Sequence, residues 1–204
     1  MKKRQFLSTA TASIAGAMGM LAVSPDLRAA AKGTSHTTAP AVLTIAGAIE
    51  RSNRGPTDPV IDQMMHKQNV KFSSAFTFDL AALARLPAVT INPTMEYDSK
   101  QHQLRGPRLA DVLDMLGASK APGTQIVFHS VDGYMPQLSF EQLRKYGFIL
   151  ATHIDGKPMA IGGFGPIFAI YDADRIAEQA QKPLDQRFAL CPWGLYCIEV
   201  VAGK

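Results

Sequence analysis

Short runs of apolar and β-branched residues, separated by turn-forming residues, recur along most of the chain. Such runs are typical of β-strands, and the residues between them are rich in glycine, proline and asparagine. The Asp-Gly pairs at 132–133 and 155–156 predict two hairpins, because this dipeptide favours the tight turns that join antiparallel strands. The predicted strands are residues 41–49, 88–92, 100–105, 124–131, 134–138, 148–154, 157–161 and 166–171, with a last strand near the C-terminus.

Helix signals lie between these strands. Asp79 is an acidic N-cap, Ser139 with Gln142 forms a capping box, and Pro107 and Gly117 bound a stretch with an apolar face. The predicted helices are residues 59–69, 80–86, 107–116 and 140–145. Because the helices are inserted between hairpins and do not alternate with single strands, we expect an α+β fold of mixed β-sheets with short inserted helices, not a doubly wound parallel sheet.

The first 31 residues have the three parts of a secretory signal peptide. The basic residues Lys2, Lys3 and Arg4 precede an uncharged run of small and apolar residues at 6–23, and a cleavage site follows near Ala31. We therefore expect cleavage, a periplasmic mature protein and no stable membrane span. A retained anchor is the weaker alternative, because the run is only mildly hydrophobic. The Lys-Arg pair resembles a twin-arginine signal, and both export routes stay open.

Cleavage changes what the charge of the chain implies. The full sequence carries 21 basic and 17 acidic residues, a net charge of +4. The predicted signal at 1–31 contains four of the basic residues and one of the acidic ones, so the mature protein has a net charge of +1. A nearly neutral protein gives no electrostatic reason to expect nucleic acid or anionic lipid as a partner. Residues 32–40 predict a flexible leader, and residues 41–204 predict one domain.

Six segments, in this order, resemble those of one protein family. They are LTIAG at 43–47, GPRLADVL at 106–113, DGY at 132–134, DGKPM at 155–159, GPIFAIY at 165–171 and WGLYCIEV at 193–200. The pattern resembles the oxidoreductase molybdopterin-binding domain family, which has the sulfite-oxidase-like fold, over residues 41–201. The resemblance implies a mixed α+β fold. In the enzymatic members it also implies a molybdenum atom held by a pterin dithiolene and one protein cysteine.

The chain departs from this family at the metal ligand. The resemblance implies the cysteine soon after the strand at 88–92, yet residues 92–98 read NPTMEYD and contain none. Without a thiolate the protein loses the soft ligand that fixes the metal and tunes its redox chemistry. The first hypothesis is therefore a module that binds a pterin or small anion in a metal-free state, as an accessory or sensor protein. The alternative is a periplasmic molybdopterin-dependent oxidoreductase with a non-cysteine ligand. Membrane haem or sensor proteins are the partners that these hypotheses imply.

Two charged or titratable residues are candidates for ligand contact. Arg105 stands before Gly106-Pro107, at the predicted entry to a helix whose free N–H groups favour anions, although a surface salt bridge is the competing interpretation. His129 precedes the DGY segment on a predicted hairpin whose end would border the cleft that the resemblance implies. Its alternative is a histidine satisfied by its own neighbours.

The remaining candidate contacts are Tyr97, Asp132, Tyr134, Tyr171 and Gly165. The first four would border the same cleft, although aromatic residues at strand ends more often pack than take part in chemistry. Gly165 closes a glycine-rich corner at 162–165. This corner is either a tight turn or a cradle for a pterin phosphate, and the dinucleotide-binding pattern fails here because a strand follows it.

Both cysteines lie near the C-terminus, at Cys191 and Cys197. A turn at 192–194 would let them form a disulfide, which an exported protein allows. A single strand over residues 189–200 would hold their Cα atoms about 20 Å apart, since each residue adds about 3.3 Å, and no disulfide spans that distance. We favour two separate thiols.

Overall fold

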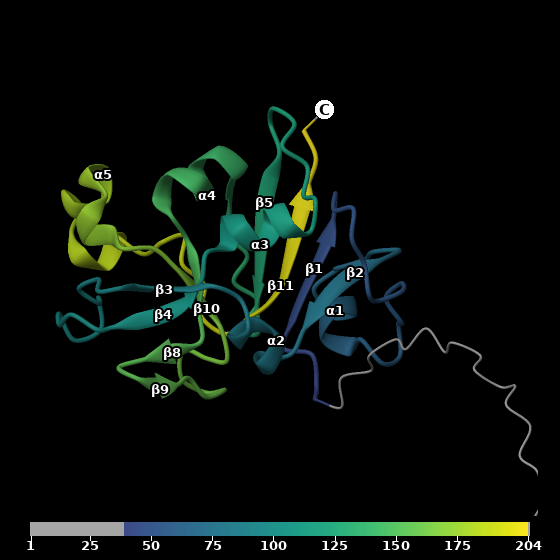
Figure 1. Ribbon diagram of the computed structural model, residues 1–204, viewed down its shortest axis with the longest axis horizontal. Coiled ribbons are helices and arrows are strands. Elements are labelled where there is room, and N and C mark those ends of the chain that lie inside the picture. The colour runs from purple at the N-terminus through teal and green to yellow at the C-terminus, as the bar shows by residue number, and fades with distance from the viewer. Residues whose placement is uncertain (1–38, 204) are drawn as a thin grey trace, which may run out of the picture. The chain divides into compact units, whose positions relative to one another are not determined.

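The longest strands form a five-stranded sheet in the computed structural model, which describes residues 39–203 (Figure 1). Its strand order is β2 (Ala75–Phe78), β1 (Leu43–Gly47), β11 (Leu195–Val201), β5 (Gln125–Ser130) and β6 (Gln137–Ser139). β1 and β11 are parallel, and every other neighbouring pair is antiparallel. The predicted signal peptide and most of the predicted leader lie outside the described residues.

A second sheet has four short strands that run across the direction of the first (Figure 1). Its order is β3 (Ala88–Ile91), β4 (Leu104–Pro107), β8 (His153–Ile154) and β9 (Lys157–Pro158). A separate antiparallel pair joins β7 (Ile149–Ala151) to β10 (Phe168–Ile170). β4 passes so close to β7 that a Cβ on Gly106 would lie 1.9 Å from the carbonyl oxygen of Leu150. Only glycine allows this approach of two backbones.

The helices are short, and two of them begin at the residue that a local capping signal predicts. They are α1 (Gln63–Lys67), α2 (Leu80–Ala84), α3 (Leu109–Met115), α4 (Phe140–Tyr146) and α5 (Ala177–Ala180), with 3₁₀ turns at Ala173–Arg175 and Leu184–Gln186. Asp79 caps α2 by accepting a hydrogen bond from the Ala82 N–H at 2.6 Å. Ser139 caps α4 by accepting from the Gln142 N–H at 3.0 Å. None of the helices between residues 39 and 203 has the length and apolar character that crossing a membrane requires.

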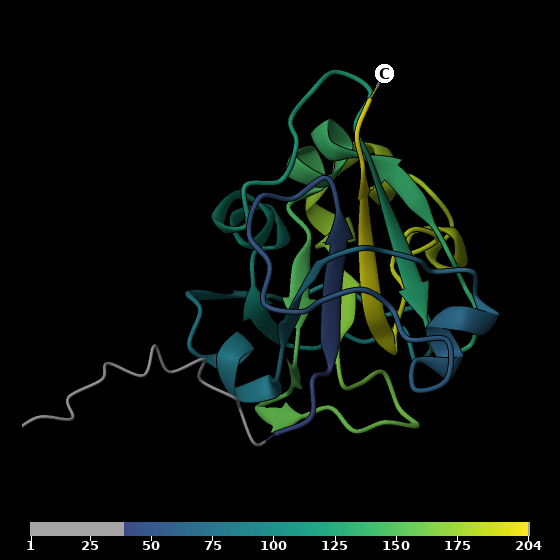
Figure 2. The same cartoon turned by 90° about the vertical axis from the view of Figure 1, so that its right-hand side faces the viewer.

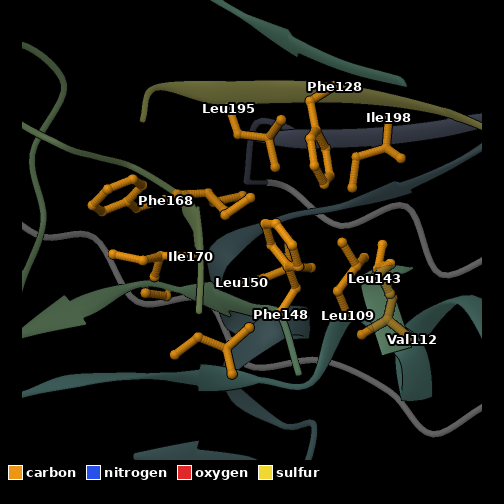
Figure 3. Packing of buried hydrophobic residues seen from close by; sticks show 14 of the residues in the cluster. Leu109, Val112, Phe128, Leu143, Phe148, Leu150, Phe168, Ile170, Leu195 and Ile198 are labelled. Carbon is orange, nitrogen blue, oxygen red and sulfur yellow. The ribbon is translucent and has the colours of Figure 1, made fainter. Parts of the chain in front are cut away.

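The main core fills the space between the five-stranded sheet and α3, α4, β7 and β10 (Figure 3). Phe128 and Ile198 point into it from the sheet, Val112 and Leu143 from the helices, and Phe148 lies between them. The opposite face of the sheet carries a smaller apolar cluster under α1. Figure 2 shows the helix α1 in front of this face. Alternating residues of β11 therefore serve two different layers.

Several elements differ from the predicted ones. Pro107 is not the first residue of a helix: it pairs with Ala88 at the end of β4, and α3 begins at Leu109 with Arg108 as its N-cap. The single strand predicted over 148–154 is divided at Thr152 into β7 and β8. The Thr152 N–H bonds to the Arg105 carbonyl at 3.0 Å at this point. The strand β2 was not predicted. The α+β class, the pairing of β3 with β4 and both Asp-Gly hairpins are confirmed.

Candidate functional site

The loop at 92–98 follows β3 and occupies the position where the resemblance implies a metal-binding cysteine. Two carboxylates from the segment after β10 hold its backbone. The Thr94 N–H donates to Asp174 Oδ2 at 2.7 Å, and the Asn92 N–H lies 3.5 Å from Asp172 Oδ2. Met95 points inward and is only 2% exposed. Asp172 and Asp174 therefore fix the backbone of the loop, and the aromatic residue that follows Met95, Tyr97, faces the solvent.

That residue is Tyr97, whose side chain is 60% exposed. Its ring lies 5.3 Å from the ring of Phe164, which in turn stacks on Phe168 at 5.4 Å. Together with Trp193 these side chains border a shallow hollow of about 260 Å³, the aromatic hollow, lined by Tyr97, Gly162, Gly163, Phe164 and Trp193. Aromatic faces bordered by glycine are suited to receive a flat ring.

The glycine-rich corner shapes one wall of the aromatic hollow. Ile161 forms bridges with both Gly163 and Gly165, so the chain folds back on itself within five residues. A Cβ on Gly165 would lie 2.3 Å from the carbonyl oxygen of Met159, which explains why a glycine stands there. The Phe164 carbonyl accepts from the Gly194 N–H at 3.0 Å and so joins the corner to the residue before β11. The corner is therefore a tight turn followed by a strand, which is the first of the two interpretations drawn from the sequence.

Cys191 lies close to the residues of the aromatic hollow. Its thiol is buried and free, and Tyr97, Tyr134 and Tyr171 lie around it. Burial raises the pKa of the Cys191 thiol far above its usual range, which keeps it protonated. Burial also raises the pKa of Tyr171, whose hydroxyl donates to the Arg187 carbonyl at 2.5 Å.

The predicted contacts at the hairpin after β5 also lie near Cys191. Tyr134 is half exposed, and its hydroxyl donates to the Ala189 carbonyl, two residues from the cysteine. Asp132 shapes the turn, because its Oδ1 accepts from the Tyr134 N–H at 3.0 Å. None of Tyr134, Tyr171, Gly165 and Asp132 lines the aromatic hollow: the two tyrosines lie near Cys191, and Gly165 directly follows Phe164.

Arg105 is not at a helix entry. It lies on β4, exposed, opposite Thr90 on β3 and His153 on β8. The expected anion site at this arginine depended on a helix beginning at Pro107, and that geometry is wrong because β4 continues through Pro107. Arg105 does not line the aromatic hollow.

His129 lies on the face of the five-stranded sheet that α1 covers, and it does not line the aromatic hollow. It is 4% exposed, its Nε2 is 2.7 Å from Glu199 Oε2, and its ring meets Tyr196 edge-on at 6.4 Å. We call His129, Tyr196, Cys197 and Glu199 the outer-face cluster. The structure bears out the alternative interpretation in part: Nε2 is paired with Glu199, whereas the buried Nδ1 has no hydrogen-bond partner. Burial raises the pKa of Cys197 to about 12, so this cysteine is also a protonated thiol.

The two cysteines are free in the structure, as favoured from the sequence. The physical reason differs from the expected one, because residues 189–200 are not a single strand. β11 begins only at Leu195, after a positive-φ turn at Gly194. A register shift between Leu195 and Cys197 then places Cys197 in the small cluster under α1, whereas Cys191 belongs to the main core.

A charged clamp ties the loop that carries Tyr97 to the second sheet. His102 Nδ1 lies 2.6 Å from Asp155 Oδ2 in the turn between β8 and β9, and its Nε2 lies 3.0 Å from Asp98 Oδ2 in the loop. The hydrogen bonds to Asp98 and Asp155 raise the pKa of His102 above 6.5. Both ring nitrogens donate only in the imidazolium form, so the observed pair of contacts is that of the protonated ring.

The cofactor implied by the resemblance has a metal part and a pterin part, and the residues fit only the second. The loop at 92–98 offers the buried thioether of Met95 in place of a thiolate, and both cysteines are protonated. Among residues 39–203, no three His, Cys, Asp or Glu side chains lie together so as to hold a metal ion. The aromatic hollow suits a flat ring.

Comparison with known proteins supports the fold. No family model matches the sequence, and no curated protein is detectably similar to it. Among solved structures, the chain is similar to the sulfane dehydrogenase SoxCD from Paracoccus pantotrophus, with a TM-score of 0.51 and 12% sequence identity. The match covers 79% of this chain but only 38% of that one, so this chain spans well under half of its length. At this identity the likeness shows the fold alone, which this chain shares with part of SoxCD.

Phe164 and Trp193 are the residues of the aromatic hollow that sequence reasoning did not select. Trp193 was noted only as the first residue of a family segment, and Phe164 only as part of the corner. The available signal was their setting, since each is flanked by glycine on one side or both. Glycine beside an aromatic ring leaves room for a ligand, but these two segments and the loop that carries Tyr97 are brought together only by the fold.

Proposed function

We propose that this chain is an exported module that binds a flat heteroaromatic ligand of the pterin kind in the aromatic hollow, without a cysteine-bound metal. The observation that carries the proposal is the aromatic hollow itself. Tyr97, Phe164 and Trp193 converge beside the loop at 92–98, where the resemblance implies the cofactor. The predicted signal peptide supports a periplasmic location for the mature domain.

Each part of the aromatic hollow has a separate role in this proposal. The rings of Tyr97 and Trp193 offer faces for offset or edge-on stacking, and such aromatic pairs contribute about 1 kcal/mol beyond the burial of apolar area. Gly162 and Gly163 carry no side chain, which leaves the backbone open to polar atoms at the rim of the ligand. Asp174 fixes the position of Tyr97 indirectly, by holding the backbone of Thr94.

Trp193 makes the proposal directly testable, because it is the single tryptophan of the chain. Titration of the mature protein with pterin should change its tryptophan fluorescence in a saturable way. Tyr97→Ala should weaken the binding about tenfold, since losing one stacked ring costs on the order of 1 kcal/mol. Met64→Ala is the matched control, because this residue is exposed on α1 and does not line the aromatic hollow. A titration without saturation, or equal binding by both variants, contradicts the proposal.

The competing enzymatic hypothesis requires molybdenum. Metal analysis and absorption spectra of protein purified from its native periplasm distinguish the two. Folded, stable protein that binds pterin without stoichiometric molybdenum is the expected result. One molybdenum per chain with a pterin chromophore would overturn the metal-free module in favour of an oxidoreductase with a non-cysteine ligand.

A further inference from the structure

The two outer strands of the five-stranded sheet, β2 and β6, differ in how their outer edges are covered. The segment before β2 closes the first edge. The backbone of Arg54 bonds to that of Ala75 in both directions at 3.0 Å. The side-chain amide of Asn53 donates to the Thr77 carbonyl at 3.0 Å and accepts from the Thr77 N–H at 2.7 Å. The chain thus occupies the backbone groups of β2 that point away from the sheet.

The opposite edge, along β6, is open. Pro136 faces β5, because its carbonyl accepts from the Phe128 N–H at 3.0 Å. In an antiparallel pair the residues that alternate with such bonded positions turn their backbone groups away from the neighbouring strand. These residues are Met135, Gln137 and Ser139, and their N–H groups form no hydrogen bond with any residue between 39 and 203.

Nothing on β6 blunts this edge. Proteins commonly protect a sheet edge with charged side chains, or with a proline whose missing N–H would have pointed outward. The outward residues Met135, Gln137 and Ser139 are uncharged, and Pro136 stands at an inward position, where it removes no outward donor. Because Gln137 is also exposed, the edge is a template for one more strand.

We infer that β6 pairs with β6 of a second copy of this chain, antiparallel and about a twofold axis at Gln137, so that two five-stranded sheets become one. At such an axis each residue meets its own copy. Gln137 suits this position because an amide side chain both donates and accepts hydrogen bonds. Met135 then lies opposite the partner's Ser139, so no like charges meet across the junction. This inference goes beyond the proposed function and does not depend on ligand binding.

The size of the edge sets the strength of this dimer. A stable interface between two proteins buries at least about 1,200 Å², more than a short strand edge supplies. The exposed side chains of Tyr134 and Met135, at 46% and 49%, add apolar area beside the edge. We therefore expect a reversible dimer with a dissociation constant of roughly 10–100 μM.

Sedimentation equilibrium of the mature protein tests the inference over concentrations from about 1 to 500 μM, which bracket this dissociation constant. The mean mass should rise from that of one chain toward that of two, and should fall again on dilution. Hydrogen exchange followed by NMR should show the amides of Gln137 and Ser139 protected only at the high concentrations. A protein that stays monomeric throughout overturns the inference.

Charge variants at the axis assign the dimer to this edge. Gln137→Lys and Gln137→Glu should each weaken association about a hundredfold or more, because like charges then meet across the axis. An equal mixture of the two should dimerise again, since opposite charges face each other. Gln181→Lys, the same change at the exposed C-cap of α5, should leave the dimer as in the parent protein.

Urea denaturation of each variant shows that it is folded, which the exposure of Gln137 leads us to expect. A dimer that persists in Gln137→Lys would lie at another surface and overturns the inference. A mixture of the two folded variants that stays monomeric overturns it as well. Pterin binding is measured separately in the same variants, so either result leaves the proposed function standing.

Discussion

Two regions of the molecule contain nearly the same kinds of side chain and differ in exposure. The outer-face cluster has a cysteine, a tyrosine, a histidine and a glutamate, and the histidine is 4% exposed. The aromatic hollow has Tyr97, which follows Glu96 in the sequence and lies near Cys191, and this tyrosine is 60% exposed. The side chains of the first region bond to one another, as His129 does to Glu199. Chemistry-bearing residues thus become a candidate site only where the fold leaves their faces open.

The largest effect that tests this contrast is expected from the outer-face cluster. His129→Ala removes the partner of Glu199 and opens a cavity beside Tyr196, so it should lower the free energy of unfolding by about 3 kcal/mol. Urea denaturation measures this loss, and the affinity for pterin should stay as in the parent protein. A weaker affinity with little loss of stability would show that the outer-face cluster has a ligand-binding role.

Gly165→Ala is expected to affect both stability and binding. The new methyl group would lie 2.3 Å from the Met159 carbonyl oxygen, so the corner has to move, at a cost of about 2 kcal/mol. Because Phe164 precedes this glycine, the wall of the aromatic hollow moves with it and pterin binding should be lost. Gly156→Ala is the control, since a Cβ there meets no atom within 4 Å, although its positive φ adds some strain. Retained pterin binding by Gly165→Ala would show that the glycine-rich corner does not shape the binding site.

The thiols provide a test of burial in both regions. Burial raises the pKa values of Cys191 and Cys197, so neither should react with Ellman's reagent in the native protein at pH 8. Addition of guanidinium chloride should release two reactive thiols per chain, since the two cysteines are free. Rapid reaction of one thiol in the native state would show that its region opens in solution.

The smallest effect is expected from pH acting on the clamp between the loop and the second sheet. The pKa of His102 is raised above its usual 6.5, so the stability it contributes is complete below pH 6.5 and is lost as pH rises through the folded pKa. The pKa values of Asp98 and Asp155 are lowered below 3.8 by their hydrogen bonds to His102, so their contribution is lost as pH falls below that range.

His102→Gln should therefore be less stable than the parent protein at pH 5.5, and the difference should shrink toward pH 9. Urea midpoints at a series of pH values measure this. The parent protein should also bind pterin somewhat more tightly at pH 5.5 than at pH 9, because the clamp holds the loop that carries Tyr97. A stability difference that does not change with pH would contradict the ionic clamp.

Signals within a few residues of each other were sufficient to predict several elements. The start of α4 depends on Ser139 and the Gln142 N–H three residues later, and the structure has that bond. The start of α3 depends on a distant segment, since Leu109 N–H bonds to the Phe148 carbonyl and Pro107 pairs with Ala88. Pro107 fits a helix start equally well from the sequence alone, so the prediction failed there.

The aromatic hollow was even less accessible to sequence reasoning. Tyr97, Phe164 and Trp193 come from three segments separated by long stretches of chain. Predicting their convergence requires the positions of β3, β10 and β11 at once. The burial of His129 was equally out of reach, because it depends on contacts with Tyr196 and Glu199 of β11, which is distant in the sequence.

The place of β11 in the large sheet also bears on how the protein reaches its native state. This strand lies between β1, the first strand of the domain, and β5. Until the ribosome has released it, β1 and β5 have no shared neighbour and their backbone edges stay open. Pairing between strands so far apart in the sequence closes a long loop and slows folding, so the centre of the sheet forms late. A chain with this order of strands keeps those edges unpaired until β11 has been made.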